Sequence, residues 1–263
     1  MDDLGGHCLE RGYQTGFSSK SAAMFDVDGR QHKARTMVAV LEDYFDGPVN
    51  QRSVLNVGGS AGIIDDYLSR HFKSVVGIDI DADAIEHAQR SFSNPNLTFE
   101  AGDAMNLRFA EGTFDVVISS QVYEHVPDAG KMMEEIYRVL KPGGVCYFAA
   151  SNRLRWNEPH YDLPLLSVIP RPLAHLYMRL ARKGDFYYEK HLSYWGLKRL
   201  IRRYSLLDYT RAVIERPERF ATDYMIRPGS AKARLAAFVA KYFLWAAPGY
   251  IWVLRKPDPA SPR

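Results

Sequence analysis

Three glycines and a serine follow the short apolar segment at residues 53–57, in the order Gly58-Gly59-Ser60-Ala61-Gly62. Glycine lets the main chain turn sharply and approach a ligand where a Cβ atom would collide. A helical pattern begins directly after this turn, so amide groups and a partial positive charge would face the same place. The turn therefore predicts a ligand-binding site but does not identify the ligand.

The spacing of these glycines differs from the G-x-G-x-x-G pattern of dinucleotide-binding enzymes. Counted from either Gly58 or Gly59, the third and sixth positions are not glycine. A nicotinamide-dependent oxidoreductase would share the fold expected below, so it stays an alternative that this spacing disfavours.

Apolar segments alternate with helical patterns as far as residue 150. We expect strands at 53–57, 75–79, 97–100, 114–118 and 145–149, and helices at 31–45, 63–72, 83–91 and 129–140. Strands that alternate with helices favour a parallel sheet covered on both faces. Ligands of such sheets bind beyond the carboxyl ends of the strands, where the strand order reverses.

The alternation breaks after residue 150. There we expect a helix at 194–203, a strand at 206–213, inserted helix and loop at 215–249, and a last strand at 250–254. Nearly every residue from 235 to 254 is apolar, close to the length of about 20 that spans a bilayer. Lys241, Pro248 and Gly249 interrupt this run, so we interpret it as a helix, a turn and a buried strand, with a membrane-touching helix as the alternative.

Five motifs in order resemble those of class I S-adenosylmethionine (SAM)-dependent methyltransferases, of the small-molecule, type 11-like family. The first is similar to V-L-D-x-G-x-G-x-G, with Asn56 in place of the acidic residue and Ser60 in place of the middle glycine. The other four are Val76-Gly77-Ile78-Asp79-Ile80, Ala101-Gly102-Asp103-Ala104, Phe114-Asp115-Val116-Val117-Ile118-Ser119-Ser120 and Leu140-Lys141-Pro142-Gly143-Gly144. The resemblance covers residues 50–150.

The resemblance implies SAM as the cofactor. In the family, the acidic residue matched by Asp79 accepts hydrogen bonds from both ribose hydroxyls, which suits a carboxylate because it only accepts. The residue matched by Asp103 accepts from the adenine amine, and Ala104 offers its backbone. The full set of expected cofactor-binding residues is Asn56, Gly58, Gly59, Ser60, Gly62, Asp79, Ile80, Gly102, Asp103, Ala104, Ser119 and Gln121.

The resemblance also implies an α/β fold: a Rossmann-like, open, mostly parallel seven-stranded sheet with helices on both faces and an antiparallel final strand. We expect a single methyltransferase domain over residues 1–263 with a helical lid insertion. Its parts are an N-terminal arm and helix at 1–49, the SAM-binding core at 50–150, the substrate lid at 151–205, C-terminal strands with a helical insertion at 206–256, and a disordered tail at 257–263.

Methyl transfer from a sulfonium is an in-line displacement, so positioning and exclusion of water are the main tasks of the enzyme. An oxygen or nitrogen nucleophile can also need a general base. Glu124 and His125 are the best candidates, in the loop after the fourth strand; the alternative is that His125 only holds this loop in place. Some relatives bind a divalent cation through E-x-x-E-H, but Gln121 occupies the first position here. An amide is the poorer ligand for hard cations, and we expect no metal.

The lid is expected to select the acceptor, because its aromatic and basic groups suit an anionic or sugar-bearing molecule and its aliphatic groups suit a lipid tail. We expect O-methylation of a small-molecule, lipid-linked or sugar-linked acceptor in a biosynthetic reaction. The expected substrate contacts are Tyr123, Arg153, Trp156, His160, Tyr161, His191 and Tyr194, with Tyr13 and Phe25 of the arm as further lid contacts. His160 and His191 are alternative bases. Equally, the aromatics could be lid core and the arginines a solvated face.

Composition limits the partners. The net charge of +3 does not by itself indicate nucleic acid, and the N/D-P-P-Y signature of amino-methylating enzymes is missing after residues 114–118. We expect no nucleic-acid partner; the oligomeric state is left open, and a non-catalytic SAM-binding protein is a further alternative.

Cys8 and Cys146 are the two cysteines, which favours a reducing cytoplasm. No signal peptide is expected, but residues 163–182 or 230–254 could contact a membrane surface.

Overall fold

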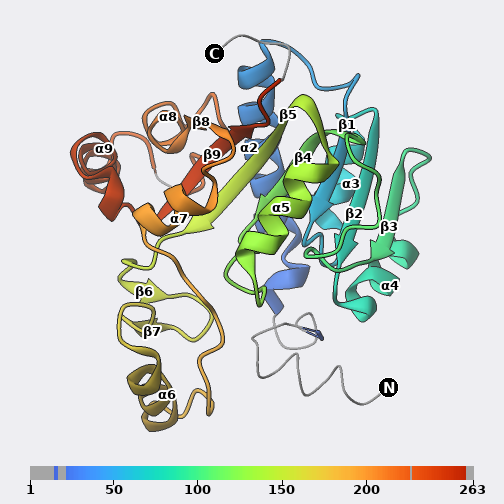
Figure 1. Ribbon diagram of the computed structural model, residues 1–263. Coiled ribbons are helices and arrows are strands. Elements are labelled where there is room, and N and C mark those ends of the chain that lie inside the picture. The colour runs from blue at the N-terminus through green and yellow to red at the C-terminus, as the bar shows by residue number, and fades with distance from the viewer. Residues whose placement is uncertain (1–14, 17–21, 226, 259–263) are drawn as a thin grey trace.

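The computed structural model describes residues 15–16, 22–225 and 227–258. Its centre is a seven-stranded sheet with the order β3-β2-β1-β4-β5-β9-β8 (Figure 1). The strands are β1 (Ser53–Val57), β2 (Ser74–Asp79), β3 (Leu97–Ala101), β4 (Phe114–Ser120), β5 (Leu140–Ser151), β8 (Ser205–Asp208) and β9 (Gly249–Arg255). β9 pairs antiparallel with both β5 and β8, and the pairs among β1 to β5 are parallel. The predicted Rossmann-like fold with an antiparallel final strand is confirmed.

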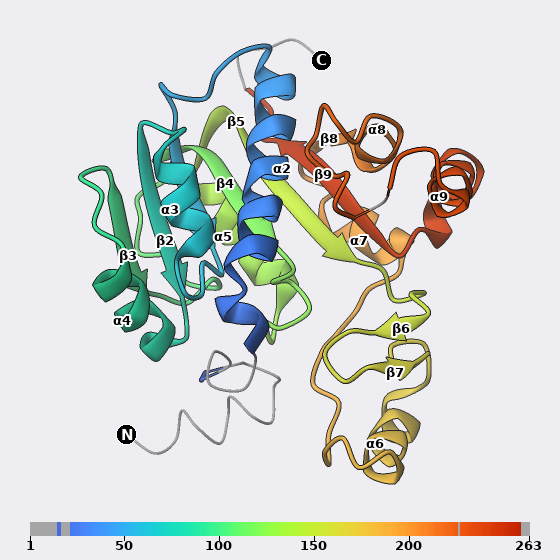
Figure 2. The same cartoon turned by 180° about the vertical axis from the view of Figure 1, so that it is seen from behind.

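Helices cover both faces of this sheet. One face of the sheet is covered by α2 (Val27–Phe45), α3 (Ile63–Ser69) and α4 (Ala82–Ser91) (Figure 2). These helices share a core with the side chains of β1, β2 and β5 that point to this face. On the other face, α5 (Ala129–Val139) and α7 (Tyr194–Leu200) pack on the alternate side chains of the same strands. Because β1 is buried on both faces from Val54 to Val57, this part of its sequence is apolar apart from Asn56.

The strand order reverses between β1 and β4. The chain runs from β1 outward to β2 and β3, then returns to β4 and β5 on the other side. Connections therefore leave these strands in opposite directions at their carboxyl ends, which is where a ligand fits in a sheet of this kind. The glycine turn after β1 and the loop after β4 both begin at this point.

Two predicted elements were wrong in detail. The strand expected at 206–213 ends at Asp208, and α8 (Thr210–Glu215) follows it. Its first turn forms because Asp208 Oδ1 accepts a 2.8 Å hydrogen bond from the Thr210 amide and Val213 is buried in the core of α2 and α3. The strand expected at 145–149 begins already at Leu140, with a shift in its pairing with β4 and with Gly143 at φ +74°.

The apolar run at 235–254 folds as a helix, a turn and a strand, as predicted. It is divided between α9 (Ala231–Tyr242), the short 3-10 helix η2 (Leu244–Ala246) and β9. Within the described part of the chain, no helix combines the length and apolar character needed to cross a bilayer. Cys8 and Tyr13 lie outside the described residues; Phe25, in the 3-10 helix η1 (Ala22–Phe25), packs edge-on against His87 of α4.

The insertion after β5 projects beyond the carboxyl end of that strand (Figures 1 and 2). It contains β6 (Asn157–Glu158), β7 (Leu163–Pro164) and α6 (Arg171–Leu180). Leu166, Ala174 and Met178 give it a small core of its own. Its returning segment is fixed to the loop after β4, because the Lys190 amide donates to Glu124 O at 2.8 Å.

Candidate active site

Three loops meet at the carboxyl end of β2. The amides of Gly58 and Gly59 each donate a 2.9 Å hydrogen bond to Ile78 O. The Ser60 amide donates to Asp79 Oδ2 at 2.8 Å, and the Gly102 amide donates to Asp79 O at 2.9 Å. The expected cofactor residues of the first three motifs are therefore brought together around Asp79.

Steric contacts explain why the turn after β1 needs glycine. Gly58 has φ +79°, and a Cβ atom there would lie 2.6 Å from Val122 Cγ2 in the loop after β4. Gly62 has φ +78°, and its Cβ atom would lie 2.7 Å from the Cβ of Ala88 and 2.8 Å from the ring of Phe99. Ser60 also adopts a positive φ, 52°, although it is not glycine. The turn is thus packed closely from behind, and its shape depends on missing side chains.

Asp79 combines burial with two main-chain donors. Burial raises the pKa of this carboxyl, and the amides of Asp81 and Ser60 offset only part of the rise. Two bonds from amides leave further acceptor capacity on the two oxygens, enough to receive a diol. Arg30 of α2, only 8 % exposed, lies within electrostatic reach of Asp65 and Asp79. Sequence reasoning missed Arg30, because nothing in the helix pattern shows that it faces the sheet edge.

Asn56 is engaged behind the turn. Its side-chain amide donates a 2.8 Å hydrogen bond to Asp65 Oδ1, and the two residues are 3 % and 0 % exposed. Burial raises the pKa of Asp65 to about 7 despite the bond from Asn56. The acidic residue that the first motif lacks at position 56 thus has a counterpart on α3. Sequence reasoning missed Asp65, although an acidic residue in the first turn of the helix that follows the glycine turn is a recognisable signal.

The remaining expected cofactor residues line the same edge of the sheet. Asp103 Oδ1 accepts a 2.7 Å hydrogen bond from the Met105 amide, and Ala104 is buried. Ile80 is half-buried at the end of β2. Gln121 has φ +58° and accepts from the Ser151 hydroxyl. Ser119 is fully buried within β4, with its hydroxyl lacking a hydrogen-bond partner among the described residues.

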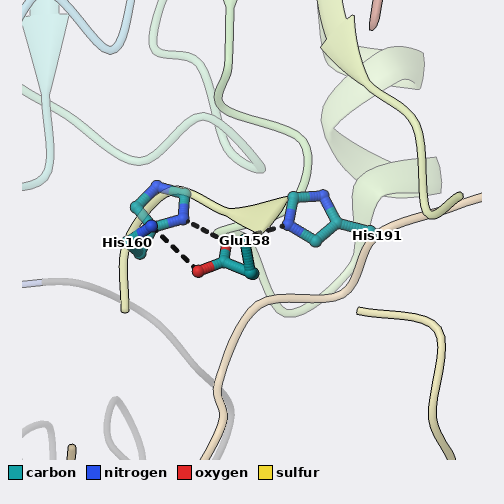
Figure 3. Close-up of side chains that lie close together, drawn as sticks. All are labelled: Glu158, His160 and His191. Atoms are coloured by element: carbon teal, nitrogen blue, oxygen red, sulfur yellow. Dashed lines mark hydrogen bonds and ion pairs between the residues drawn. The ribbon is translucent and has the colours of Figure 1, made fainter. Parts of the chain in front are cut away.

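Three histidines and three glutamates gather where the insertion after β5 meets the loop after β4. We call these residues, Glu124, His125, Glu158, His160, Glu189 and His191, the histidine–glutamate cluster. Glu158 Oε1 lies 2.6 Å from His160 Nδ1 and 3.3 Å from His191 Nε2 (Figure 3). His125 Nδ1 lies 3.8 Å from Glu189 Oε1, and its ring contacts that of His160 edge-on with centroids 4.8 Å apart.

The electrostatics of this cluster follow from burial and from its mixed charges. Burial alone would raise the pKa of Glu158, but the hydrogen bonds with His160 and His191 outweigh it and lower the pKa to about 2. Burial lowers the pKa of His125 to about 3, and the neighbouring histidines add to the shift. Burial raises the pKa of Glu124. His125 is therefore a neutral imidazole near neutral pH, in the protonation state of a base.

Among the expected substrate residues, the structure brings His160, Tyr161 and His191 to this cluster, and the others lie elsewhere. Tyr123 is buried, and its hydroxyl donates to Ser151 O at 2.6 Å. The guanidinium of Arg153 donates to Ser167 O inside the lid. Trp156 is 70 % exposed. Tyr194 packs against Tyr250 and Trp252 of β9. Glu189 was missed, because one glutamate in a run of aromatic and basic residues carries no distinctive signal.

Residues 55–148 match a family model described as a methyltransferase domain. Over 114 residues, 43 % of each chain, the protein is 32 % identical to a probable S-adenosylmethionine-dependent methyltransferase of Mycolicibacterium smegmatis. Over 148 residues, 54 % of each chain, it is 30 % identical to a ubiquinone biosynthesis O-methyltransferase of Psychrobacter cryohalolentis. The chain spans about half the length of these curated relatives.

The fold agrees with this match. The solved structure of a SAM-dependent methyltransferase from Thermotoga maritima superposes with a TM-score of 0.54 over 95 % of this chain and 98 % of that one, at 14 % identity. The residues present also fit the cofactor of these proteins, because Asp79 keeps acceptor capacity for a diol at the carboxyl end of β2. Residues 55–148 are thus similar in sequence to class I SAM-dependent methyltransferases, and the chain shares their fold.

Proposed function

We propose that this protein transfers the methyl group of SAM to an oxygen atom of a small-molecule or lipid-linked acceptor. One observation carries the proposal: the glycine turn, Asp79 and the Gly102–Ala104 loop converge at the point of strand reversal, and the loop after β4 leads from there to a buried base. Cofactor and acceptor would thus meet beneath the lid.

The cofactor half follows from the contacts around Asp79. We assign the ribose hydroxyls to the carboxylate of Asp79, and the adenine to Asp103 and the backbone of Ala104. The backbone of the turn at 58–62 would contact the rest of the cofactor, because the Ser60 amide joins this turn directly to the Asp79 carboxylate. Arg30 would supply a buried positive charge for the carboxylate of the methionyl group.

The acceptor half uses the histidine–glutamate cluster. A lone pair of the acceptor oxygen attacks the methyl carbon while the carbon–sulfur bond breaks and its electrons return to sulfur, leaving S-adenosylhomocysteine. The proton lost by the acceptor goes to the imidazole of His125. Glu124 is buried and the His125 side chain is only 17 % exposed, which supports this role, since a site that excludes water protects the sulfonium from side reactions.

The lid supports an acceptor with an apolar portion. On α6, Leu173, Leu176 and Leu180 are 56 %, 46 % and 75 % exposed, and Arg171 and Arg179 flank them. Leucines spaced three and four residues apart form one apolar stripe on a helix. Such a stripe with basic neighbours suits the surface of an anionic membrane, from which a lipid-linked acceptor could be reached.

Two measurements test this function. Isothermal titration of the full chain with S-adenosylhomocysteine and with NAD should show binding of the first, and binding of NAD alone would eliminate the proposal in favour of an oxidoreductase. Mass spectrometry of extracts supplied with methyl-labelled SAM should then reveal a labelled product. Binding of S-adenosylhomocysteine without any labelled product would instead indicate a non-catalytic SAM-binding protein.

A further inference from the structure

We propose that Glu158, His160 and His191 form a binding site for a divalent transition-metal ion, with zinc the best match to their donors. The site lies in the lid and uses none of Gln121, Glu124 and the E-x-x-E-H pattern considered from sequence. It is independent of the cofactor site around Asp79.

The geometry of the three side chains carries the proposal. Each offers one ligand atom, and these atoms all lie within 4.8 Å of one another. Both imidazoles point at the same carboxylate oxygen, Glu158 Oε1, at 2.6 and 3.3 Å (Figure 3). Zinc–nitrogen and zinc–oxygen bonds of about 2.0 Å place the ligand atoms of a tetrahedral site roughly 3.3 Å apart. Small side-chain movements therefore suffice to arrange the three around one ion.

The surroundings contain buried negative charge that a cation would compensate. Glu124, Glu158 and Glu189 are 1 %, 0 % and 2 % exposed. Neither carboxylate oxygen of Glu124 has a hydrogen-bond partner among the described residues, although His191 and His160 act on its charge. A buried carboxylate without partners is costly, and a nearby dication removes much of that cost.

One histidine nitrogen is also left over. Nδ1 of His191 is buried and lacks a hydrogen-bond partner among the described residues, while its Nε2 faces Glu158. A histidine that binds a metal through one nitrogen commonly gives the proton of the other to a carboxylate. Glu124 is a suitable acceptor, because the backbone of its loop is tied to the segment carrying His191 by the 2.8 Å bond from the Lys190 amide.

The position of the ligands in the chain suggests what the metal does. Glu158 and His160 lie where the lid leaves the sheet, and His191 lies where it returns. An ion held by all three would close the intervening loop, which carries β7 and α6 and has only a small core of its own. Metal removal should therefore loosen the lid while leaving the sheet intact.

Three protein ligands leave a fourth position on a tetrahedral ion. Two imidazoles and one carboxylate are the donor set of catalytic zinc sites, in which the open position takes water or substrate. An acceptor hydroxyl bound there would lose its proton more readily. This last step rests on the proposed methyl transfer, whereas the metal site itself does not.

The test measures metal binding and cofactor binding separately on the full chain. Protein treated with chelator is titrated with zinc chloride by calorimetry, and cobalt chloride is added to a second sample to record its visible spectrum. We expect one ion per chain and the intense absorption of tetrahedral cobalt. His160→Ala, His191→Ala and Glu158→Gln should each weaken zinc binding by about 100-fold or more, whereas His87→Ala, at an exposed histidine of α4, should not.

Binding of S-adenosylhomocysteine reports that each variant is folded. Wild-type protein that binds this nucleoside but takes up no more zinc than a His160→Ala/His191→Ala double variant would overturn the proposal. Octahedral cobalt absorption, or full zinc affinity in the ligand variants, would overturn it equally. Zinc binding without nucleoside binding would support the metal site and contradict the proposed methyl transfer, so the two failures are distinguishable.

Discussion

The main-chain amide of Ser60 donates a 2.8 Å hydrogen bond to Oδ2 of Asp79. This bond joins the turn after β1 to the end of β2, and the Gly102 amide extends the connection to the loop after β3. Asp79 therefore has two tasks: it holds three loops in register, and it keeps acceptor capacity for a ligand. Substitutions at this position should affect ligand binding more than the fold, because the main-chain bonds to Ile78 O and Asp79 O remain.

Asp79→Asn should weaken binding of S-adenosylhomocysteine by about 10- to 100-fold, since a hydrogen bond to a charged group is worth roughly 1.5–3 kcal/mol. The amide keeps the shape of the side chain but replaces one acceptor oxygen with a donor. Isothermal titration measures the effect. Asp83→Asn, on the exposed side of α4, is the matched control and should bind normally. Equal affinity of the Asp79 variant and the wild type would show that this carboxylate does not hold the ribose.

Gly62→Ala should lower the free energy of unfolding by about 2–4 kcal/mol, because the added methyl group meets both a positive φ and close atoms. Gly143 has a similar φ of +74°, but no heavy atom lies within 4 Å of the place that a Cβ atom would take, so Gly143→Ala isolates the backbone strain. Its cost should be about 1 kcal/mol. Gly47→Ala, without positive φ or close atoms, should cost least. Urea unfolding of the three variants gives the order, and a Gly62 variant as stable as the Gly143 variant would contradict it.

Asp65 should make the protein less stable as the pH rises. The pKa of its buried carboxyl is about 7 in the folded state against 3.8 as the ordinary value. The folded state therefore holds a proton that the unfolded state releases between these values, and stability is lost as the pH rises through 7. Asp65→Asn keeps an acceptor for Asn56 and removes the ionisation. The variant should gain stability over the wild type from pH 4 to pH 8, up to about 4 kcal/mol.

Urea unfolding at a series of pH values tests this expectation. The difference between Asp65→Asn and the wild type should be smallest at acid pH and should level off above the folded-state pKa. Asp66→Asn, at the neighbouring position, provides the comparison for a carboxylate paired with Arg70. Parallel stability curves for the Asp65 variant and the wild type would mean that this carboxyl is not protonated in the folded protein.

His125→Ala should lower kcat by about 100-fold or more if the imidazole accepts the proton of the acceptor. The affinity for S-adenosylhomocysteine should stay unchanged, because His125 lies on the lid side of the loop after β4. Glu124→Gln, which removes a carboxylate from the cluster, should have a smaller effect on kcat, since Glu124 does not itself take the proton. His71→Ala, at a histidine that stacks on Tyr67 of α3, is the control. Full activity in both cluster variants would remove them from the chemistry.

The sequence predicts the strands and helices up to residue 150 well, because strands buried on both faces are mostly apolar, as the segments 54–57 of β1 and 116–118 of β4 are. It fails at 206–213, where Tyr209 and Val213 have strand propensity but Asp208 starts a helix that packs on α2. The sequence alone also cannot show that the side chains of Glu158 and His191 are in contact. Their contact spans 33 residues and depends on the path of the lid, which no local pattern encodes.

The apolar stripe of α6 should bind the protein to anionic vesicles. Replacing Leu173, Leu176 and Leu180 with serine removes exposed apolar surface at the outer end of the lid, and should lower the vesicle-bound fraction about tenfold or more. Co-sedimentation with vesicles of phosphatidylglycerol and phosphatidylcholine measures it. The matched control replaces Leu235 and Phe238 on α9, which are similarly exposed. If the α9 variant loses vesicle binding and the α6 variant keeps it, the membrane contact lies at residues 230–254 instead. If the wild-type protein does not bind these vesicles, the proposal of a membrane-bound acceptor is contradicted.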